Sequence, residues 1–419
     1  MAQGLRDILL PGREPSASSG ARRCGCLGRT VSDALEVLTV PVLPELDRQV
    51  RRNFYLDVAS NSLSGLFAGF TLQFVPVVAR RMEADVFLLA FILAAPYIGS
   101  IVTIFAGYLL PQRRQVLFAG VLLGLGRAAL ALVFFTTTPL QFSLVVLIAW
   151  VVFTFPNPLM VDLTRRRYPA ENRGRLLGYV WMCWTMGATA GSVVCGWSMD
   201  IWSPQLLFPI GAVFGVLGAV AYTLISIPDE DHKPRFGALS TLRILREDRS
   251  FALYTAAWFV WGLGGILASP LYPIILVNRL SASYTQVGVL NFVTSAAWFL
   301  SYVFWGSRID RLSPVRALMV SFMLNALVPI VYLVSPNVWY VAIASATIGF
   351  INGGIDLAGL NSTIQLAPQG RLPQYSALQT VVVGVRGVIA PFAGSALAAS
   401  PWMGIDGVLV VASITTLLG

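Results

Sequence analysis

The side chains of this sequence that could do chemistry are a few polar and charged residues inside long apolar runs. Arg386 is the clearest case, because it is the only charged residue in TVVVGVRGVIAPFAG (380–394). A cation within an apolar run is tolerated where it has a partner or faces water. Arg386 therefore has two interpretations: a structural ion pair, or a site for a substrate or a coupling ion.

Asp57 and Asp356 are the acids expected to be buried within the apolar runs, which makes them candidate partners for Arg386 and candidate proton carriers. A carboxylate in a low-dielectric site holds a proton more readily than one in water, and a nearby arginine opposes that effect. Alternation between the two environments would couple proton binding to a conformational change. The alternative for each acid is a static ion pair or a position near a helix end.

Other polar residues repeat at helical spacing, so they would share helix faces with these charges. Asn61 lies four residues after Asp57, on the same face of a helix. Asn352 is related to Asp356 in the same way, and we expect such faces to line a water-filled cavity. The predicted substrate and coupling residues are Asp57, Asn61, Arg127, Asn157, Asn291, Asn352, Asp356, Gln379 and Arg386.

Arg127, and three aromatic residues outside this set, have a structural alternative. Arg127 is expected to be structural and to reach an acid inside the helix bundle. Tyr254, Trp258 and Trp261 recur at helical spacing and would line a site for an apolar or aromatic substrate. The alternative for the three aromatic residues is a membrane-interface belt or a lipid-facing surface.

The composition indicates which elements must position these residues. Hydrophobic residues make up 56% and charged residues 12% of the 419 residues, whereas soluble domains have about 25% charged residues. A membrane helix needs roughly 20 apolar residues, and the sequence offers twelve such runs. The predicted spans are 54–79, 86–110, 116–136, 139–162, 178–199, 206–227, 251–277, 286–306, 316–335, 338–361, 376–399 and 404–419. We therefore predict an all-α polytopic membrane protein.

The basic residues predict the orientation of these spans. Eight Lys or Arg residues precede the first span, sixteen fall in even-numbered loops and three in odd-numbered loops. Positive charge collects in cytoplasmic loops, so both termini and the even-numbered loops are expected in the cytoplasm of a plasma-membrane protein. The net charge of +9 then reflects topology and does not require a nucleic-acid partner.

An internal repeat divides the spans into two halves. At an offset of 199 residues, Pro169 after the fourth span matches Pro368 after the tenth span. Asn157 within the fourth span matches Asp356 within the tenth. The predicted parts are a cytoplasmic, largely disordered tail (1–50), a first six-helix half (51–227), a cytoplasmic linker (228–250) and a second half (251–419). Two six-helix halves of parallel topology are typical of secondary transporters.

The loop after the eighth span reads GSRIDRLSPVR (306–316), and its glycine, acid and arginines resemble the loop signature of the major facilitator superfamily. In the corresponding loop of the first half, Pro111 stands where that signature has its acid. The resemblance covers about 50–419 and implies two six-helix halves with gating loops on the cytoplasmic side. The predicted gating residues are Gly107, Arg113, Arg114, Arg173, Gly306, Asp310, Arg311 and Arg316. The alternative is a set of ordinary basic turns.

The fifth span carries Gly178, Gly187, Gly191 and Gly196, a spacing similar to the glycine motif of proton-coupled drug exporters. Two positions depart from that motif, with Ser192 in place of proline and Cys195 in place of glycine. The alternative is close packing of helices through small residues.

Several classes of function are disfavoured. His232 is the only histidine and the four cysteines lack further metal ligands, so we expect no metal site and no cofactor. No nucleotide-binding loop and no nucleophile–base set is present, which argues against an ATP-driven pump and against an enzyme. The tail lacks the apolar segment of a signal peptide. The short last span, 404–419, suggests that the chain is truncated after Gly419.

The leading hypothesis is a monomeric secondary transporter that works by alternating access in a lipid bilayer. It would export a small amphipathic molecule in exchange for protons. One alternative is uptake of an anionic metabolite, with Arg386 as the counter-ion of the anion. The other is a membrane sensor or scaffold that transports nothing.

Overall fold

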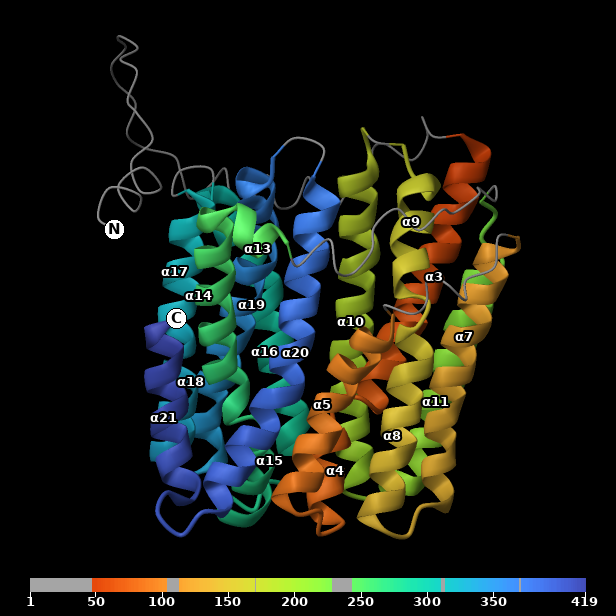
Figure 1. The fold of residues 1–419 in the computed structure, drawn as a ribbon. Helices are drawn as coiled ribbons and strands as arrows, with labels where there is room; N and C mark the ends of the chain where they lie inside the picture. The colour runs from red at the N-terminus through yellow and green to blue at the C-terminus, as the bar shows by residue number, and fades with distance from the viewer. Residues whose placement is uncertain (1–46, 104–112, 170, 228–242, 310–312, 369–370) are drawn as a thin grey trace, which may run out of the picture. The chain divides into compact units, whose positions relative to one another are not determined.

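The computed structural model describes residues 47–103, 113–169, 171–227, 243–309, 313–368 and 371–419. Every regular element in those ranges is a helix, and most of the long helices run side by side (Figure 1). The elements are α3 (Arg48–Phe70), α4 (Val75–Arg81), α5 (Val86–Val102), α7 (Gln115–Ala129), η3 (Leu130–Phe135), α8 (Pro139–Thr154), α9 (Asn157–Arg167), α10 (Arg173–Met199), α11 (Pro204–Thr223), α13 (Ile244–Glu247), α14 (Arg249–Leu267), α15 (Leu271–Ile274), η4 (Ile275–Arg279), α16 (Tyr284–Ile309), α17 (Pro314–Asn325), α18 (Leu327–Val334), α19 (Val338–Leu366), α20 (Leu372–Ala399) and α21 (Gly404–Leu418).

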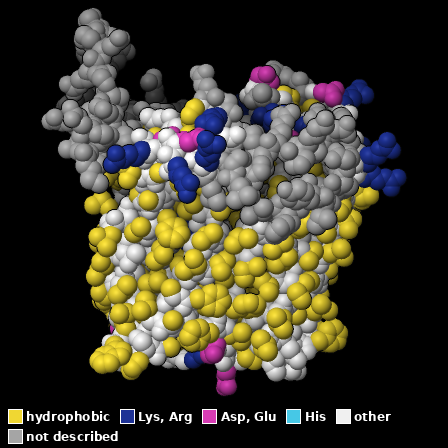
Figure 2. Space-filling model, viewed as in Figure 1, with side chains coloured by type: hydrophobic (Ala, Val, Ile, Leu, Met, Phe, Trp, Pro, Cys, Tyr) yellow, Lys and Arg dark blue, Asp and Glu magenta, His cyan; other side chains and the backbone are white. Residues whose placement is uncertain are grey.

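The described helices match the predicted membrane spans. Nine of them, counting consecutive helices together, are long and apolar enough to cross a membrane, and α5 and α21 are shorter apolar helices. The 27-residue α10 packs against α3 and α16 and supplies the remaining predicted span. Hydrophobic side chains cover the middle of the face seen in Figure 2, while charged side chains gather near its two ends. A bilayer is the environment that stabilises such a surface.

Several predicted spans are interrupted helices rather than single ones. The run 54–79 consists of α3 and α4, and the run 139–162 consists of α8 and α9. Proline stands in the first turn of α4 (Pro76) and of α9 (Pro158), where the missing N–H group is not needed. The run 251–277 contains α14, α15 and the π-helical turn η4.

Two predicted boundaries shift because an aspartate caps a helix. Asp47 accepts a hydrogen bond from the backbone N–H two residues later, so α3 begins inside the predicted tail 1–50. Asp248 caps α14 in the same way, by accepting a hydrogen bond from the backbone N–H of Phe251. The last part of the predicted linker 228–250 is therefore helical. Such caps satisfy N–H groups that the helix leaves free. The rest of the tail and of the linker lies outside the described residues.

We call α3–α11 the N-terminal helices and α13–α21 the C-terminal helices. They meet through α5 with α20, α10 with α16, and α4 with α15 and η4. We call the side of the turns at 82–85, 200–203, 280–283 and 400–403 the odd-loop side, after the predicted loop numbers, and the opposite side the even-loop side. In Figure 1, α4 and α15 mark the odd-loop side at the bottom, and α13 marks the even-loop side at the top.

Glycines bring α3 and α10 into backbone contact. A Cβ atom added to Gly65 would lie 2.2 Å from the carbonyl oxygen of Trp184, and one added to Gly187 would lie 2.5 Å from that of Ser62. A Cβ atom on Gly178 would meet nothing within 4 Å. The structure therefore supports the packing interpretation for Gly187, with no need of an exporter motif.

Replacing Gly187 with Ala is expected to lower the melting temperature of the detergent-solubilised protein, because overpacking costs about 1–3 kcal/mol. Gly178→Ala on the same helix is the matched control and should be neutral or stabilising, since alanine favours helix by up to about 1 kcal/mol. Differential scanning fluorimetry compares the two. Equal melting temperatures for the two variants would show that a Cβ atom at position 187 can be accommodated between α3 and α10 without loss of stability.

Candidate functional site

Asp57 on α3 forms a buried ion pair with Arg167 at the end of α9. The side chains are 3% and 2% exposed, respectively. The hydroxyl group of Tyr168 donates to Asp57 Oδ2 at 2.7 Å, and Asn61 Nδ2 donates to Asp57 Oδ1 at 3.0 Å. The guanidinium of Arg167 also lies over the ring of Tyr222, 5.0 Å from its centroid. Because its charge is neutralised within the N-terminal helices, Asp57 has the interactions of a structural ion-pair residue.

Arg127 on α7 has no acid partner among the described residues. Its Nη1 donates to the carbonyl oxygen of Gly215 on α11 at 3.0 Å, and its guanidinium lies 5.6 Å from the centroid of the Phe67 ring. The acid that Arg127 was expected to reach is therefore not found among the described residues around it. The contacts with Gly215 and Phe67 are those of a residue that joins α7 to its neighbours.

Asp356 on α19 faces α16. Its Oδ2 accepts hydrogen bonds from the hydroxyl group of Tyr302 at 2.7 Å and from Trp298 Nε1 at 3.1 Å. The residue is exposed in the absence of lipid, and no basic side chain of the described residues forms an ion pair with it. Asp356 is thus a membrane-embedded carboxylate held by neutral donors. Of the other predicted polar residues on these two helices, Asn352 is half-buried, and Asn291 Nδ2 is buried without a partner among the described residues.

Gln379 on α20 belongs to a third cluster. Its Oε1 accepts a hydrogen bond from the hydroxyl group of Thr363 at 2.7 Å, and its Nε2 donates to the hydroxyl oxygen of Tyr254 at 3.2 Å. The cluster joins α14, α19 and α20 within the C-terminal helices. Asn157, the first residue of α9, is exposed. The predicted residues therefore form separate clusters rather than one.

Arg386 lies half-way along α20 and is 6% exposed. Its Nη1 donates to the carbonyl oxygen of Trp258 on α14, and its guanidinium lies 5.3 Å from the centroid of the Trp261 ring. Neither Asp57 nor Asp356 pairs with it, because both acids are held by the partners described above. The direct pair considered from the sequence is thus not formed, and the charge of Arg386 has no acid partner among the described residues.

A hydrogen-bonded contact between the two sets of helices lies on the odd-loop side. Asp200, which follows α10, accepts a hydrogen bond from Tyr284 N on Oδ1 at 2.8 Å and one from Thr285 N on Oδ2 at 2.9 Å. These N–H groups open α16 and have no partner within the helix. Asp200 therefore caps a helix of the other set.

The same contact holds the pKa of Asp200 below its ordinary value of 3.8. Burial by itself raises the pKa, but hydrogen bonds from Thr285, Tyr284 and Ser283 stabilise the carboxylate and outweigh burial. Asp200 is thus ionised at neutral pH, where a carboxylate next to the positive end of a helix is favourable.

Two arginines in the last turn of α4 extend this contact. Arg80 Nε donates to Asn278 Oδ1 at 3.0 Å, and Arg81 Nη2 donates to the carbonyl oxygen of Ala282. The guanidinium of Arg81 also stacks 3.7 Å from the centroid of the Tyr284 ring. We call Arg80, Arg81, Asp200 and their partners at 278–285 the latch.

Close helix approach supports the latch. The backbones of α10 and α16 touch at small residues, since a Cβ atom on Gly196 would lie 2.6 Å from the carbonyl oxygen of Tyr284, and one on Gly288 2.7 Å from that of Ser192. Ser395 Oγ on α20 donates to the carbonyl oxygen of Val86, the first residue of α5, at 2.9 Å. All of the hydrogen bonds between described residues of the two sets therefore lie on the odd-loop side.

On the even-loop side, the hydrogen bonds between described residues remain within one set of helices. Asn53 Nδ2 on α3 donates to the carbonyl oxygen of Ser226, which follows α11, at 2.8 Å. The hydroxyl group of Tyr375 on α20 donates to Asp248 Oδ2 at 2.9 Å. The two sets are thus joined by hydrogen bonds on one side and not on the other, as far as the described residues extend.

The predicted gating residues lie on the even-loop side where they are described. Arg173 Nη2 donates to the carbonyl oxygens of Arg165 and Tyr168, which braces the turn between α9 and α10. Gly306 on α16 has open space around its Cα atom. Arg113, Arg114 and Arg316 are exposed. Gly107, Asp310 and Arg311 lie outside the described residues, so the gating role stays a prediction.

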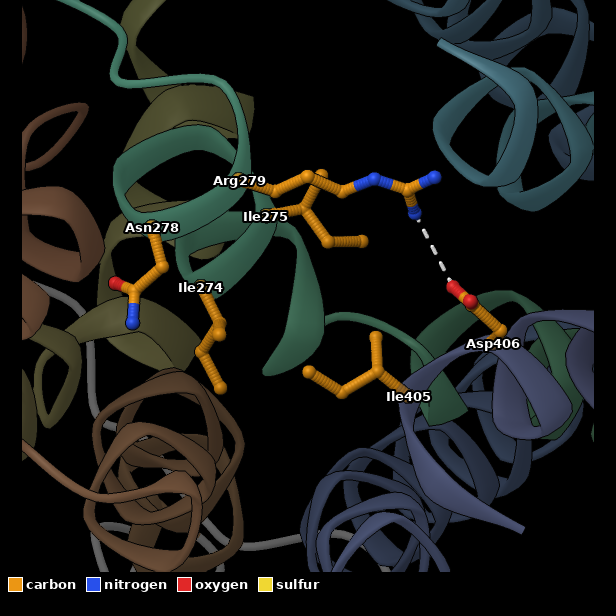
Figure 3. A pocket seen from close by; sticks show the side chains of 6 residues that line it. All are labelled: Ile274, Ile275, Asn278, Arg279, Ile405 and Asp406. Atoms are coloured by element: carbon orange, nitrogen blue, oxygen red, sulfur yellow. Dashed lines mark hydrogen bonds and ion pairs between the residues drawn. The ribbon is translucent and has the colours of Figure 1, made fainter. Parts of the chain in front are cut away.

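A surface pocket of about 310 Å³ lies on the odd-loop side between η4 and the start of α21. Its lining includes Arg279 and Asp406, whose side chains meet at 3.2 Å across the pocket (Figure 3). Both charges are exposed, and such ion pairs contribute little to stability. None of the predicted site residues lines this pocket, so it is not the predicted central site.

The latch residues were missing from the sequence-based predictions. Arg80 and Arg81 were counted only as loop charges, and no prediction was made for Asp200. An acid in a loop carries no signal for the distant helix that it caps. Arg167 was assigned to a basic loop, although a signal existed. Leu159, Leu163 and Arg167 are four residues apart and form the buried face of α9.

Comparison with known proteins identifies the family to which this fold belongs. A sequence model described as Major Facilitator Superfamily matches residues 58–268 and 254–419. The chain belongs to this superfamily. No curated protein matches the sequence significantly. The family prediction and the predicted fold class, an all-helical polytopic membrane protein of this superfamily, are confirmed.

Several solved structures of transporters share the fold at low sequence identity. A mutant of the nucleoside transporter NupG is 11% identical, with a TM-score of 0.70 over 88% of this chain and 97% of that chain. A peptide transporter POT in complex with sulfate is 14% identical, with a TM-score of 0.66 over 88% of this chain and 92% of that chain. A POT family transporter in complex with a thioalcohol-conjugated peptide is 12% identical, with a TM-score of 0.67 over 88% and 94%.

The superfamily and these neighbours indicate a multi-pass membrane transporter and not an enzyme. At these identities the neighbours establish the fold alone. The chain is therefore a membrane transporter of this superfamily.

Proposed function

We propose that the chain is a secondary active transporter that works by alternating access. The observation that supports this proposal is the one-sided latch, because the two sets of helices are hydrogen-bonded to each other on the odd-loop side alone among the described residues. Alternating access needs halves that close on one side of a midplane site while the other side opens. The halves would be those predicted above, 51–227 and 251–419.

The distribution of Lys and Arg supports an orientation. Arg80, Arg81 and Arg279 are the basic residues on the odd-loop side, whereas the even-loop side carries most of the others. On this basis the odd-loop side faces the outside, both termini are cytoplasmic and the latch closes the protein to the outside. We place the protein in the plasma membrane as a monomer.

Proton coupling with export of a small amphipathic molecule is the proposed mode of transport. Asp356 is the proposed proton carrier, because its carboxylate lies within a membrane helix and is held by Tyr302 and Trp298, with no cation from the described part of the chain. Protonation would weaken both hydrogen bonds between α19 and α16 and so change how these helices contact each other. Uptake of an anionic metabolite is the second candidate, and the absence of an acid partner for Arg386 among the described residues favours it.

The test is flux in proteoliposomes under an imposed pH gradient, with a panel of amphipathic cations and organic anions. Gradient-driven flux of at least one compound is expected in the wild type, and its direction distinguishes export from uptake. Asp356→Asn should reduce the response to the gradient at least about tenfold, while exchange without a gradient persists. Asp406→Asn, an exposed acid on the odd-loop side, is the control and should behave as the wild type.

Gradient-driven flux that is unchanged in Asp356→Asn would exclude Asp356 as the proton carrier. Absence of flux for every compound, together with saturable binding of one of them, would favour the sensor or scaffold hypothesis over transport.

A further inference from the structure

Arg386 and two tryptophans of α14 carry buried hydrogen-bond donors without an acceptor among the described residues. The Nε of Arg386 is buried and has no such acceptor. The indole Nε1–H groups of Trp258 and Trp261, on the adjacent turn of α14, are also buried without an acceptor. An unsatisfied buried donor costs about 1–3 kcal/mol and calls for an explanation, and a partner outside this part of the chain is one such explanation.

The guanidinium is nevertheless held in a fixed place. Its Nη1 donates to the carbonyl oxygen of Trp258, and a Cβ atom added to Gly262 would lie 1.9 Å from Nη1 and 2.0 Å from Cζ. Gly262 therefore provides the space that the guanidinium occupies. This is a positioned cation with an unused donor, which differs from an arginine that extends to solvent.

The surroundings of Arg386 are aromatic and involve both sets of helices. The ring of Trp261 lies under the guanidinium and stacks on Phe322, with centroids 4.0 Å apart. Tyr97 of α5 packs against the next residue, Gly387, where an added Cβ atom would lie 2.2 Å from its ring. Arg386 thus lies where α5, α14 and α20 meet, half-way along α20. A ligand bound here would contact both sets of helices.

A structural ion pair does not account for these contacts. The membrane-embedded acids Asp57 and Asp356 are bound to other groups, and the described neighbours of Arg386 supply one carbonyl oxygen and aromatic rings. A cation on an aromatic face is stabilised by only about 0.5–2 kcal/mol. A desolvated guanidinium with a free N–H is instead suited to an anionic oxygen, to which it forms short charge-assisted hydrogen bonds.

We propose that Arg386, positioned by Gly262 and Trp258, is the binding subsite for the anionic group of a small aromatic organic acid. The inference rests on the proposed transport function and names the substrate class of that site. The donors match a carboxylate, phosphate or sulfonate group, and the rings of Trp261 and Tyr97 match an aromatic body. Because Tyr97 comes from the N-terminal helices, occupancy of the subsite would link the two sets.

The experiment is ligand-dependent thermal stabilisation of the purified full chain in detergent at constant ionic strength. The probes are benzoate, phenyl phosphate and benzenesulfonate, with benzyl alcohol and benzylamine as neutral and cationic analogues. A saturable rise in melting temperature is expected for at least one anion and for neither analogue. The relative response to the three anions identifies the preferred group.

Variants test the assigned residues. Arg386→Gln and Gly262→Ala should each raise the apparent Kd for the preferred anion at least about tenfold, the first by removing the charge and the second by displacing it. Arg386→Lys keeps the charge and should bind more weakly than the wild type but better than Arg386→Gln. Gly265→Ala is the matched control on α14, because only the end of the Asn325 side chain would have to move, and it should keep wild-type affinity.

Three results would overturn the proposal: no saturable response to any of the three anions, equal responses to benzoate and benzyl alcohol, or wild-type affinity in Arg386→Gln. The flux experiment above is separate. Binding of an anion without flux would retain the subsite and reject transport, whereas gradient-driven flux of a cation without anion binding would retain transport and reject the subsite.

Discussion

Asp57→Asn is expected to destabilise the protein by about 3–5 kcal/mol, which is the usual loss when one partner of a buried ion pair is removed. The pair with Arg167 is almost fully buried, so the arginine would retain an uncompensated charge next to Tyr168 and Tyr222. The measurement is the melting temperature together with the yield of monodisperse protein in detergent. Both should fall well below the wild-type values.

A double variant separates charge from packing. Asp57→Asn with Arg167→Gln removes both charges and should be more stable than either single variant, because no buried charge then lacks a partner. Arg165→Gln is the matched control, since Arg165 is an exposed arginine on the same helix. A double variant no more stable than Asp57→Asn would show that the loss comes from packing and hydrogen bonds rather than from the unpaired charge.

Asp200→Ala is expected to release the latch. The variant loses both hydrogen bonds to the first N–H groups of α16, and loss of a capping carboxylate costs about 0.5–2 kcal/mol. Opening on the odd-loop side should therefore become about 2-fold to 30-fold more frequent. Double electron–electron resonance between spin labels at Trp202 and Trp402, both exposed on that side, measures the opening in a variant without the native cysteines.

The pH dependence of the latch provides a second measurement. The pKa of Asp200 is lowered in the latched state, so the latch is at full strength above the ordinary value of 3.8 and weakens as the pH falls through the lowered pKa. Spin-label distances should be constant between about pH 5 and 8 and lengthen only below about pH 4. Asp406→Ala, on the same side, should leave them unchanged, and lengthening near pH 6 would contradict the assignment to Asp200.

The sequence was sufficient to predict the class of fold. Hydropathy located the spans because a bilayer requires about 20 apolar residues in each, and this requirement acts on each span by itself. It did not predict the interruptions after α3 and α8, since the apolar composition continues through them. Pro76 and Pro158 were visible in the sequence, but whether a proline begins a helix or bends one depends on packing.

The site was predicted less well, because its contacts join residues far apart in the chain. Asp57 and Arg167 form an ion pair but are separated by more than one hundred residues. Asp57 was therefore assigned to a cavity, and Arg167 to a basic loop. Helical spacing placed Asn61 beside Asp57 correctly, since it is a local property. Trp258 and Gly262 are neighbours of Arg386 because of the way α14 and α20 pack. No local pattern in the sequence predicts that packing.

The Asp200 contact also determines which mutations can reveal the latch. One partner is a side chain, but the other consists of two main-chain N–H groups, which almost every amino acid at 284 and 285 would supply. A scan of side chains along α16 would therefore leave these two hydrogen bonds intact. Proline is the exception, because it lacks the N–H group and is tolerated in the first turn of a helix. We expect genetic evidence for this contact at Asp200, and in α16 from proline at position 284 or 285.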